Sequence, residues 1–511
     1  MQNNFINYFE KTVELNPFKK AIIEKNSSIN FINLKNRSIK VSLELQKFNK
    51  DSSNFLVAVY LDKSINLSIS NIAVTYAGGF FVNIDPENPI NKNLTILKKL
   101  SPKIIITDNK NFKLLKNKLN KKYKVLVYEK LIKKNFLKIK KKQNFYKNRI
   151  DADPYCIINT SGSTGTPKGV VLSHKNFFDF MEWTKDEFQF RKNLIIGSLS
   201  PSVFDIFNFE IFMMAFNSST IVIIPKIYIP FPYEILKFIK QRKVNFIFWV
   251  PTIMVNIANQ NLLDKINIKS IKTIWFAGEV FPTKQFNYWQ KKLNKTQFVN
   301  LYGPIEITLD CIFYKIKKKI DLKHKIPIGV PCKNTDILIM NKNNKICKNY
   351  EEGEICVRGS SVALGYYNDH ENTKKRFVQN PLNKMYQETI YKTGDFAYKD
   401  NNNQIIFLGR KDNQIKHLGY RIELSEIEHF ILSFIKKVRN CCVNYNANQK
   451  KIIMFYESRF RLSDKYFYNI LKKYVPKYMI PNKFLSEKKI KMNLNGKVDR
   501  QFYQNKTNKI V

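Results

Sequence analysis

The sequence predicts an α/β protein with more than one domain, for two reasons. Short apolar runs rich in β-branched and aromatic residues alternate with amphipathic stretches, and this alternation is typical of parallel sheets covered by helices. The length of 511 residues is enough for three to four structural units or one large multi-lobed protein. The clearest expected strands are 55–61, 103–108, 123–128, 219–225 and 244–251, and the clearest expected helices are 232–241 and 282–293.

The composition is that of a folded but strongly basic protein. Hydrophobic residues make up 44% of the chain, which excludes global disorder. Lys and Arg number 87 against 41 Asp and Glu, a net charge of +46 that would suit nucleic acid, an anionic membrane surface or an acidic protein. Abundant Lys, Asn, Ile, Phe and Tyr with few Gly and Pro are equally typical of an AT-rich codon bias, and both explanations stay open. The Lys-rich stretch 110–149 has recurring apolar residues and no RNA-binding motif, so we expect no nucleic-acid partner.

The cysteines and the apolar runs predict a cytoplasmic protein without a membrane span. The seven cysteines form no CxxC pair, which argues against a zinc site or a disulfide framework. The first residues have neither a basic leader nor an apolar core of a signal peptide. The longest apolar region, 205–224, is interrupted by polar and acidic residues.

The strongest local motif is NTSGSTGTPKG at 159–169, between expected strands at 155–159 and 169–174. Its small residues leave backbone N–H groups free to face an anion, its hydroxyls can reach a metal, and Lys168 adds positive charge. The spacing is not that of a Walker sequence. A flexible hairpin is the alternative, but we expect a phosphate-binding loop.

A change of pattern near Gly409 predicts a domain boundary. A smaller and strongly basic block follows, with an expected helix at 425–436 and an expected strand at 451–458. We therefore place the boundary at about 410–412, which divides the chain into 1–410 and 411–511.

Five further motifs follow the Ser/Thr/Gly loop in order: NLYGPIE (300–306), GEICVRG (353–359), YKTGD (391–395), GRKDNQIKHLGYRIELSEIE (409–428) and NGKVDR (495–500). Together, and over nearly the whole chain, they resemble the adenylate-forming superfamily, which includes acyl-CoA synthetases, luciferases and amino-acid adenylation domains. The resemblance implies a large N-terminal domain of stacked αβ subdomains with a β-barrel-like subdomain, and a small mobile α+β C-terminal domain. It also implies attack of a carboxylate on the α-phosphate of ATP, with Mg²⁺ as the metal.

The same resemblance assigns roles to individual residues. Lys497, Thr164 and Glu306 are the expected catalytic residues, and Thr164 and Glu306 are also the expected Mg²⁺ ligands. Tyr302 is expected to stack on adenine and Asp395 to bind the ribose hydroxyls. The residues expected to bind ATP are Thr160, Ser161, Gly162, Ser163, Thr164, Gly165, Thr166, Lys168, Asn300, Tyr302, Gly303, Asp395, Arg410 and Lys497.

Simpler explanations exist for three of these residues: Tyr302 as a core aromatic, Glu306 as a surface charge and Asp395 as a turn former. One position departs from the superfamily pattern, because Ile305 stands where a Thr is usual. The missing hydroxyl removes one hydrogen bond, about 1 kcal/mol net, so weakened adenylation is expected rather than an inactive enzyme.

The segment PSVFDIFNFEIFMMAF at 201–216 bears on the substrate. Amino-acid adenylation domains and D-alanine–carrier-protein ligases carry Phe-Asp at its start, and that Asp pairs with the substrate ammonium; here it is Asp205. A helix N-cap is the alternative role for Asp205. The side-chain pocket is expected to be lined by Ile206, Phe209, Phe248, Trp275, Ala277, Leu301, Leu309 and Asp310, which favours a small or modest apolar amino acid. Asp310 could face solvent or recognise a polar side chain.

The resemblance thus predicts an amino-acid ligase, and D-alanine is one possible substrate. The ligase is expected to transfer the activated acid to the phosphopantetheine thiol of a separate, acidic carrier protein. Asp412 occupies the hinge position, and Gly419 is expected beside the tunnel for the carrier thiol. A carboxylate–CoA ligase of the same superfamily, a nucleotide-binding module without activity and a nucleic-acid-binding protein are the alternatives.

Overall fold

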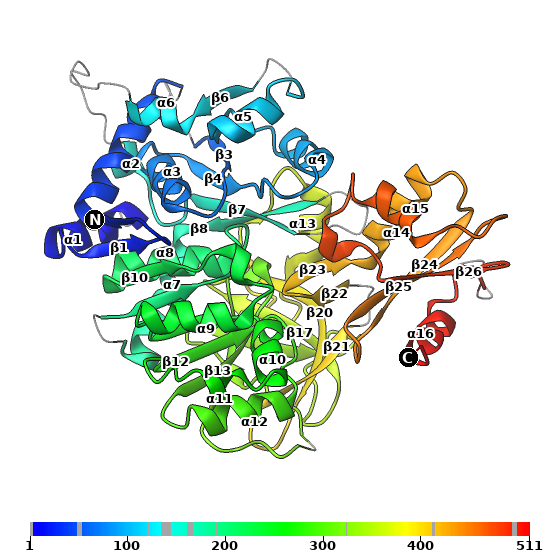
Figure 1. Cartoon of the computed structure of the whole chain (residues 1–511). Coiled ribbons are helices and arrows are strands. Elements are labelled where there is room, and N and C mark those ends of the chain that lie inside the picture. Colours follow the sequence, from blue (N-terminus) through cyan, green and yellow to red (C-terminus); the bar gives the residue numbers. More distant parts are fainter. Residues whose placement is uncertain are drawn as a thin grey trace. The chain divides into compact units, whose positions relative to one another are not determined.

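The computed structural model describes residues 4–48, 54–119, 123–133, 145–160, 167–190, 193–322, 324–410, 414–492 and 498–510 (Figure 1). It forms two compact units. The larger comprises 1–85, 102–158 and 169–409, and the smaller comprises 86–101, 159–168 and 410–511. The division into 1–410 and 411–511 stays a prediction, and residue 412 lies outside the described residues.

The first sheet of the structure has seven strands in the order β18-β8-β7-β4-β3-β5-β6. Its strands are β3 (Leu56–Tyr60), β4 (Phe80–Asn83), β5 (Ile104–Thr107), β6 (Lys124–Val127), β7 (Pro154–Thr160), β8 (Lys168–Ser173) and β18 (Gly365–Tyr366). The pairs β7–β4, β4–β3, β3–β5 and β5–β6 are parallel, whereas β18 is antiparallel to β8. Parallel strands bring their carboxyl ends to one edge, and β7 ends at that edge where the Ser/Thr/Gly loop begins.

The second sheet has nine strands in the order β15-β14-β13-β12-β11-β9-β10-β1-β2. Its strands are β1 (Lys20–Ile23), β2 (Ser28–Asn30), β9 (Ile195–Ser198), β10 (Thr220–Ile223), β11 (Phe246–Trp249), β12 (Thr273–Ala277), β13 (Gln297–Tyr302), β14 (Ile312–Ile316) and β15 (Val330–Pro331). The six strands from β1 to β13 in this order are parallel. Most of their residues are apolar, as expected for strands that are buried on both faces.

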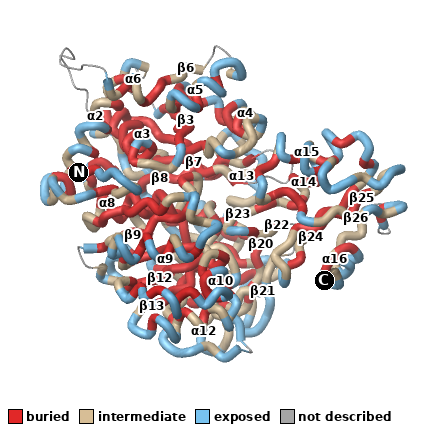
Figure 2. The backbone as a smooth tube through the Cα atoms, viewed as in Figure 1, coloured by how far each residue is buried: buried red, intermediate tan, exposed pale blue. Residues whose placement is uncertain are grey.

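The nine-stranded sheet separates two hydrophobic clusters. In β11, Phe246 and Phe248 belong to one cluster, and Ile247 and Trp249 belong to the other. The helices that contribute to the first cluster are α1 (Phe5–Leu15), α2 (Phe31–Gln46), α3 (Ile65–Tyr76), α6 (Tyr128–Lys133), α7 (His174–Phe188) and α8 (Asp205–Asn217). Those that contribute to the second are α9 (Pro232–Gln241), α10 (Pro251–Asn259), α11 (Leu262–Lys265) and α12 (Thr283–Lys292). The tube in Figure 2 shows the resulting buried interior.

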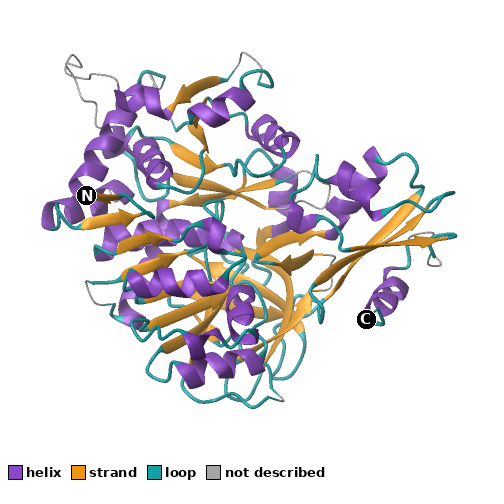
Figure 3. Cartoon of the chain, in the orientation of Figure 1, coloured by secondary structure: helices purple, strands orange, loops and turns teal. Residues whose placement is uncertain are grey.

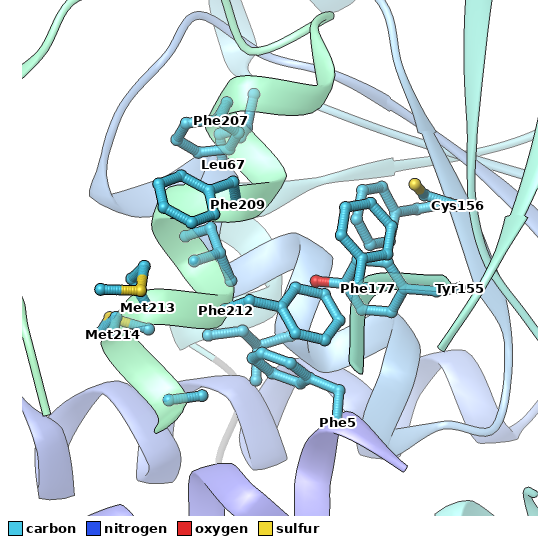
Figure 4. Packing of buried hydrophobic residues seen from close by; sticks show 14 of the residues in the cluster. Phe5, Leu67, Tyr155, Cys156, Phe177, Phe207, Phe209, Phe212, Met213 and Met214 are labelled. Carbon is cyan, nitrogen blue, oxygen red and sulfur yellow. The ribbon is translucent and has the colours of Figure 1, made fainter. Parts of the chain in front are cut away.

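Helix α8 packs against both of the mainly parallel sheets, and Figure 4 shows its Phe212 beside Tyr155 and Phe177. Its Phe212 ring is 4.9 Å from Tyr155 of β7, and its Phe209 ring is 5.4 Å from Trp275 of β12. Every residue from Ile206 to Ala215 is buried, as expected for a helix that is apolar on all sides. The start of α8, with Asp205 as its first residue, is therefore held by both sheets.

The third sheet is antiparallel and corresponds to the expected β-barrel-like subdomain. Its order is β16-β17-β20-β19, with β21 paired to β20. Its strands are β16 (Thr335–Met340), β17 (Gly353–Gly359), β19 (Phe377–Gln379), β20 (Thr389–Lys399) and β21 (Ile405–Arg410), and the nearby helices are η3 (Ile305–Ile307) and α13 (His370–Arg376).

The smaller unit is α+β, as expected (Figure 3). A three-stranded sheet and a two-stranded hairpin share a core with its helices. The elements are α4 (Ile90–Leu100), β22 (Gln414–His417), β23 (Tyr420–Glu423), α14 (Leu424–Phe434), β24 (Asn440–Asn446), β25 (Lys451–Glu457), α15 (Asp464–Leu471), η4 (Lys477–Met479), β26 (Lys483–Glu487) and α16 (Arg500–Asn508). The remaining short helices of the chain are α5 (Asn109–Leu115), η1 (Phe145–Asn148) and η2 (Lys226–Tyr228).

The strands and helices expected from the sequence occur within one or two residues of their predicted ends. In the described part of the chain, no helix combines the length and apolarity needed to cross a membrane.

His174 links acid stability to the packing of the larger unit. Its imidazole is buried, accepts a hydrogen bond from the backbone N–H of Phe5 at 3.2 Å and packs edge-on against Tyr155. Burial lowers the His174 pKa to about 3, with a further lowering by Arg149 opposed by Asp153. The unfolded chain, with a His pKa of about 6.5, binds a proton that the folded protein excludes, so stability contributed by neutral His174 declines as pH falls below about 6.5.

We predict that the free energy of unfolding of the larger unit loses about 1 kcal/mol between pH 7.5 and 5.5 through this residue. His174→Asn, which keeps an acceptor, should be less stable at pH 7.5 but should lose less stability over the same interval. Denaturant unfolding at both pH values measures this, with the exposed His324→Asn as control. An unchanged pH dependence in His174→Asn would contradict the prediction.

Candidate functional site

Tyr302 and Asp395 come together from two different sheets. Tyr302 ends β13, and its hydroxyl donates a hydrogen bond to Asp395 Oδ2, with 2.5 Å between the two oxygens. The two residues are 6% and 3% exposed. Burial raises the pKa of Tyr302 and the adjacent carboxylate raises it further, so the phenol stays protonated and remains a donor. Asp395 lies within β20, where its N–H is bound to Thr393 Oγ1, and not in the turn that was one alternative for it. Tyr302 belongs to a hydrophobic cluster, and its adenine-binding role stays a prediction.

The segment after Tyr302 folds back in a tight turn that requires glycine at 303. A Cβ on Gly303 would lie 2.3 Å from the Leu309 carbonyl oxygen and 2.5 Å from the Asp310 Cα. Thr308 and Leu309 have φ values of 56° and 63°, which close the turn. The sequence YGPIE thereby places Glu306 and the predicted pocket residues Leu309 and Asp310 in one compact loop.

Glu306 is an interior carboxylate, so the surface-charge alternative for it is wrong. It is 1% exposed and accepts a hydrogen bond from the Tyr366 hydroxyl at 2.9 Å. Tyr366 pairs with Val170 of β8, the strand that follows the Ser/Thr/Gly loop in sequence. Ile305, beside Glu306, packs against the main core, so the side chain that replaces the usual Thr contributes apolar contact.

Glu306, in the loop after β13, is a suitable ligand for Mg²⁺. Glu306 offers carboxylate oxygen, the donor that Mg²⁺ prefers. No group of three or more His, Cys, Asp and Glu that could hold a metal occurs among the described residues. The donor set therefore fits a cation held mainly by substrate phosphates with a single carboxylate, as is usual for Mg²⁺ in nucleotide sites.

Several predicted nucleotide-binding residues have observable surroundings. Asn300 on β13 donates from its amide to the Pro327 carbonyl at 2.7 Å. At the base of the Ser/Thr/Gly loop, the Thr160 hydroxyl donates to the Lys168 carbonyl at 3.4 Å. Arg410 ends β21. Residues predicted for the loop itself, Ser161, Gly162, Ser163, Thr164, Gly165 and Thr166, lie outside the described residues, as do Lys497 and the hinge residue Asp412.

Asp205 is the first residue of α8 and not its N-cap, so the capping alternative is wrong. The N-cap is Phe204, and no side-chain capping bond is present. Asp205 Oδ1 accepts the N–H of Ile206 at 2.9 Å, and its charge contributes, after burial, to the raised pKa of Cys156 on β7. A carboxylate at a helix N-terminus is stabilised by the helix dipole. Asp205 is thus an anionic group at the point where α8 meets β7.

The apolar residues predicted for the substrate pocket cluster one turn further along α8. Phe209, Phe248 and Trp275 are fully buried, and their ring centroids lie 5.4 to 5.8 Å apart. The other aliphatic members of the predicted set are nearly buried at 2–7% exposure: Ile206, Ala277, Leu301 and Leu309. The structure therefore brings the predicted pocket residues together as a dense aromatic cluster with an aliphatic margin.

Asp310 is 4% exposed, so the expectation that it could face solvent is wrong. Its carbonyl accepts the Cys332 thiol at 3.8 Å, and its charge contributes to the raised pKa of that thiol after burial and Cys311.

In the smaller unit, the described residues before and after 493–497 make defined contacts. Met492 and Val498 form an antiparallel bridge across 493–497. Arg500, the first residue of α16, makes a two-pronged ion pair with Glu428 of α14, and Glu428 also accepts the Val443 N–H at 2.7 Å. In the hairpin of β22 and β23, Leu418 and Gly419 have φ values of 53° and 81°, a conformation that favours glycine.

Sequence reasoning missed Tyr366, the donor to Glu306, and Lys63, Asn83 and Glu210 around the start of α8. Tyr366, Lys63 and Asn83 lie at least 60 residues in sequence from the residues that they contact. A buried position for Glu210 could have been inferred from the apolar residues on all sides of it in α8.

The AMP-binding enzyme family model matches residues 9–367, and the chain belongs to this family. The chain is 30% identical over 96% of its length to gramicidin S synthase 1 of Brevibacillus brevis, of which it spans 43%.

Two solved structures share the fold. One is an artificially fused adenylation–PCP di-domain NRPS from Klebsiella oxytoca, with TM-score 0.81, 20% identity and coverage of 97% of this chain and 94% of that one. The other is an o-succinylbenzoate CoA synthetase from Bacillus subtilis, with TM-score 0.84, 20% identity and 99% coverage of both chains.

We predict that Glu306→Gln will raise the Mg²⁺ concentration needed for half-maximal ATP–pyrophosphate exchange, because the amide keeps the shape but removes the charge. Tyr366→Phe should shift it in the same direction by roughly tenfold, as expected when the partner that orients a metal ligand is removed. Glu371→Gln, at an exposed position of α13, is the control. Wild-type Mg²⁺ dependence in Glu306→Gln would remove this residue from the metal site.

Proposed function

We propose that this chain activates a small amino acid with ATP and transfers it to the phosphopantetheine thiol of a carrier protein. In the first step a carboxylate oxygen forms a bond to the α-phosphorus and the bond to the leaving pyrophosphate breaks. In the second step the thiol sulfur attacks the acyl carbon, AMP leaves with the bonding pair, and the thiol proton is released. Mg²⁺, when bound, neutralises phosphate charge during the first step.

The observation that carries the amino-acid assignment is Asp205 at the start of α8. A carboxylate at this position offers the negative charge and the hydrogen-bond acceptors that a substrate ammonium requires. One turn later on the same helix, Phe209 reaches the aromatic cluster, so an ammonium at Asp205 would place the substrate side chain toward Phe209 and Trp275.

The density of this cluster supports a small side chain. Phe209, Phe248 and Trp275 are each 0% exposed and pack on one another. A large substrate side chain would have to displace closely packed rings, at a cost typical of overpacking. Glycine and alanine of either hand, including D-alanine, are the proposed substrate class.

The remaining roles follow the family resemblance. Lys497 would bridge the substrate carboxylate and the nucleotide during adenylation, Tyr302 and Asp395 would hold adenosine, and Asp412 would act as the hinge for a movement that brings Gly419 to the thiol tunnel. A carboxylate–CoA ligase is the second candidate, supported by the fold shared with a CoA synthetase.

The amino-acid assignment predicts a selective effect of Asp205→Asn. Loss of the counter-charge should raise the KM for the amino acid by at least roughly tenfold, the scale of a lost charge-assisted bond, while the KM for ATP changes little. The variant should also discriminate less between the amino acid and the same acid without its amino group. ATP–pyrophosphate exchange over glycine and both alanine enantiomers measures this.

The exposed Asp264→Asn is the matched control for Asp205→Asn. Equal changes in both KM values, or none, would refute an ammonium site at Asp205 and favour a carboxylate–CoA ligase.

The carrier assignment predicts that the acyl group is transferred to a phosphopantetheinylated acidic carrier faster than to free CoA. A +46 chain steers an acidic partner electrostatically, so transfer should slow as salt rises from low to physiological levels while pyrophosphate exchange hardly changes. Thioester formation with both acceptors measures this, with Lys497→Ala as the variant that forms no adenylate. Preferential acylation of CoA would overturn the carrier assignment. If both half-reactions depend equally on salt, the positive charge has no role in carrier binding and is explained by codon bias.

A further inference from the structure

The backbone just ahead of Asp205 is held by side chains from the seven-stranded sheet. Lys63, which follows β3, donates from Nζ to the Ser200 carbonyl at 2.6 Å. Asn83, the last residue of β4, donates from Nδ2 to the Ser202 carbonyl at 2.9 Å. Ser200 and Ser202 lie in the 199–204 segment between β9 and α8, and both are nearly buried. Two carbonyl groups of one short segment are thus bound from two neighbouring strand ends.

Lys63 is itself fixed by the first turns of α8. Its Nζ lies 3.9 Å from Glu210 Oε2 and 5.1 Å from the centre of the Phe207 ring. Glu210 is fully buried and accepts a hydrogen bond from the Ser198 hydroxyl at the end of β9. Burial lowers the Lys63 pKa to about 8 and Glu210 opposes this, so the ammonium is mostly charged at neutral pH.

These contacts connect three parts of the larger unit at the start of α8. Lys63 lies in the loop after β3 and Asn83 ends β4, both of the seven-stranded sheet, whereas Ser198 ends β9 of the nine-stranded sheet and Glu210 lies on α8 itself. Figure 4 shows Phe207 and Phe209 on this helix, two residues apart, and they therefore point in different directions around its axis. Phe207 packs under Lys63, whereas Phe209 reaches Trp275 in the predicted substrate pocket. The first two turns of α8 therefore contact Lys63 on one face and line the predicted pocket on the opposite face.

We propose that Lys63 and Asn83 are positioning residues for Asp205. By binding the Ser200 and Ser202 carbonyl groups they fix the entry into α8, so that the Asp205 carboxylate is presented where the substrate ammonium binds. Neither residue is assigned a contact with substrate. The inference rests on the proposed function, because it assumes that Asp205 binds the amino group.

Lys63→Met tests the inference by removing the cation while keeping much of the side-chain volume. We expect the KM for the amino acid to rise roughly tenfold, the scale of one charge-assisted hydrogen bond, with the KM for ATP and kcat within about twofold of wild type. Lys63→Arg retains the charge and the donor and should restore most of the affinity. Lys185→Met, at an exposed position of α7, is the matched control.

Two further variants separate positioning from a general loss of stability. Lys63→Met leaves Glu210 buried without its cation, so Lys63→Met/Glu210→Gln removes both charges and leaves no unpaired carboxylate. The double variant still lacks the bond to Ser200, and its amino-acid KM should stay raised. Asn83→Leu breaks the bond to Ser202 independently and should produce a rise of the same kind.

A wild-type amino-acid KM in both the double variant and Asn83→Leu would overturn the inference. So would a parallel rise in the KM values for amino acid and ATP, because it would indicate general destabilisation. Asp205→Asn, measured beside them, separates the two hypotheses. If Asp205→Asn raises the amino-acid KM and the Lys63 and Asn83 variants do not, the inference fails and the proposed function stands. If Asp205→Asn itself has no effect, the proposed function fails and the inference falls with it.

Discussion

The hydrogen bond from Tyr302 to Asp395 joins the end of a parallel strand to an antiparallel sheet inside one hydrophobic cluster. Leaving either buried polar group without a partner would cost about 1–3 kcal/mol, and more for a charge, so the pair constrains where β13 ends relative to β20. The tight turn at Gly303 begins at this fixed point and carries both Glu306 and Asp310 into the interior. The proposed nucleotide and substrate residues of this loop therefore share one anchor.

Helix α8 makes a comparable connection between the two parallel sheets. Its apolar side chains are buried on all sides of the helix. The acidic residues Asp205, at its start, and Glu210, in its second turn, are therefore the groups whose burial requires hydrogen bonds or ion pairs. Glu210 accepts a hydrogen bond from Ser198 and forms an ion pair with Lys63. Lys63 and Asn83 donate hydrogen bonds to the carbonyl groups of Ser200 and Ser202, which directly precede the helix. Burying such a network is costly unless it is paired, and its pairing orients the helix end that carries Asp205.

Composition and site chemistry bear on different parts of the proposed activity. The charge of +46 concerns the approach of a partner, because electrostatic steering acts over distances near the Debye length. The aromatic cluster of Phe209, Phe248 and Trp275 concerns the size of the substrate, because closely packed rings resist displacement. Neither property depends on the other, so a codon-biased surface is compatible with a selective pocket.

The sequence by itself determined the α/β class, the strands and helices that were expected from it, and the family, because apolar periodicity and the ordered motifs are local properties of the chain. It also identified Glu306 and Asp205, but it could not exclude a surface charge for the first or a helix cap for the second. Only the tertiary structure decided that Glu306 is buried against Tyr366, that Phe204 caps α8, and that Asp310 is interior. The same holds for Lys63 and Asn83, which lie more than a hundred residues from the carbonyl groups that they bind. Burial and pairing across such separations depend on how the sheets pack together, and no local sequence pattern encodes that packing.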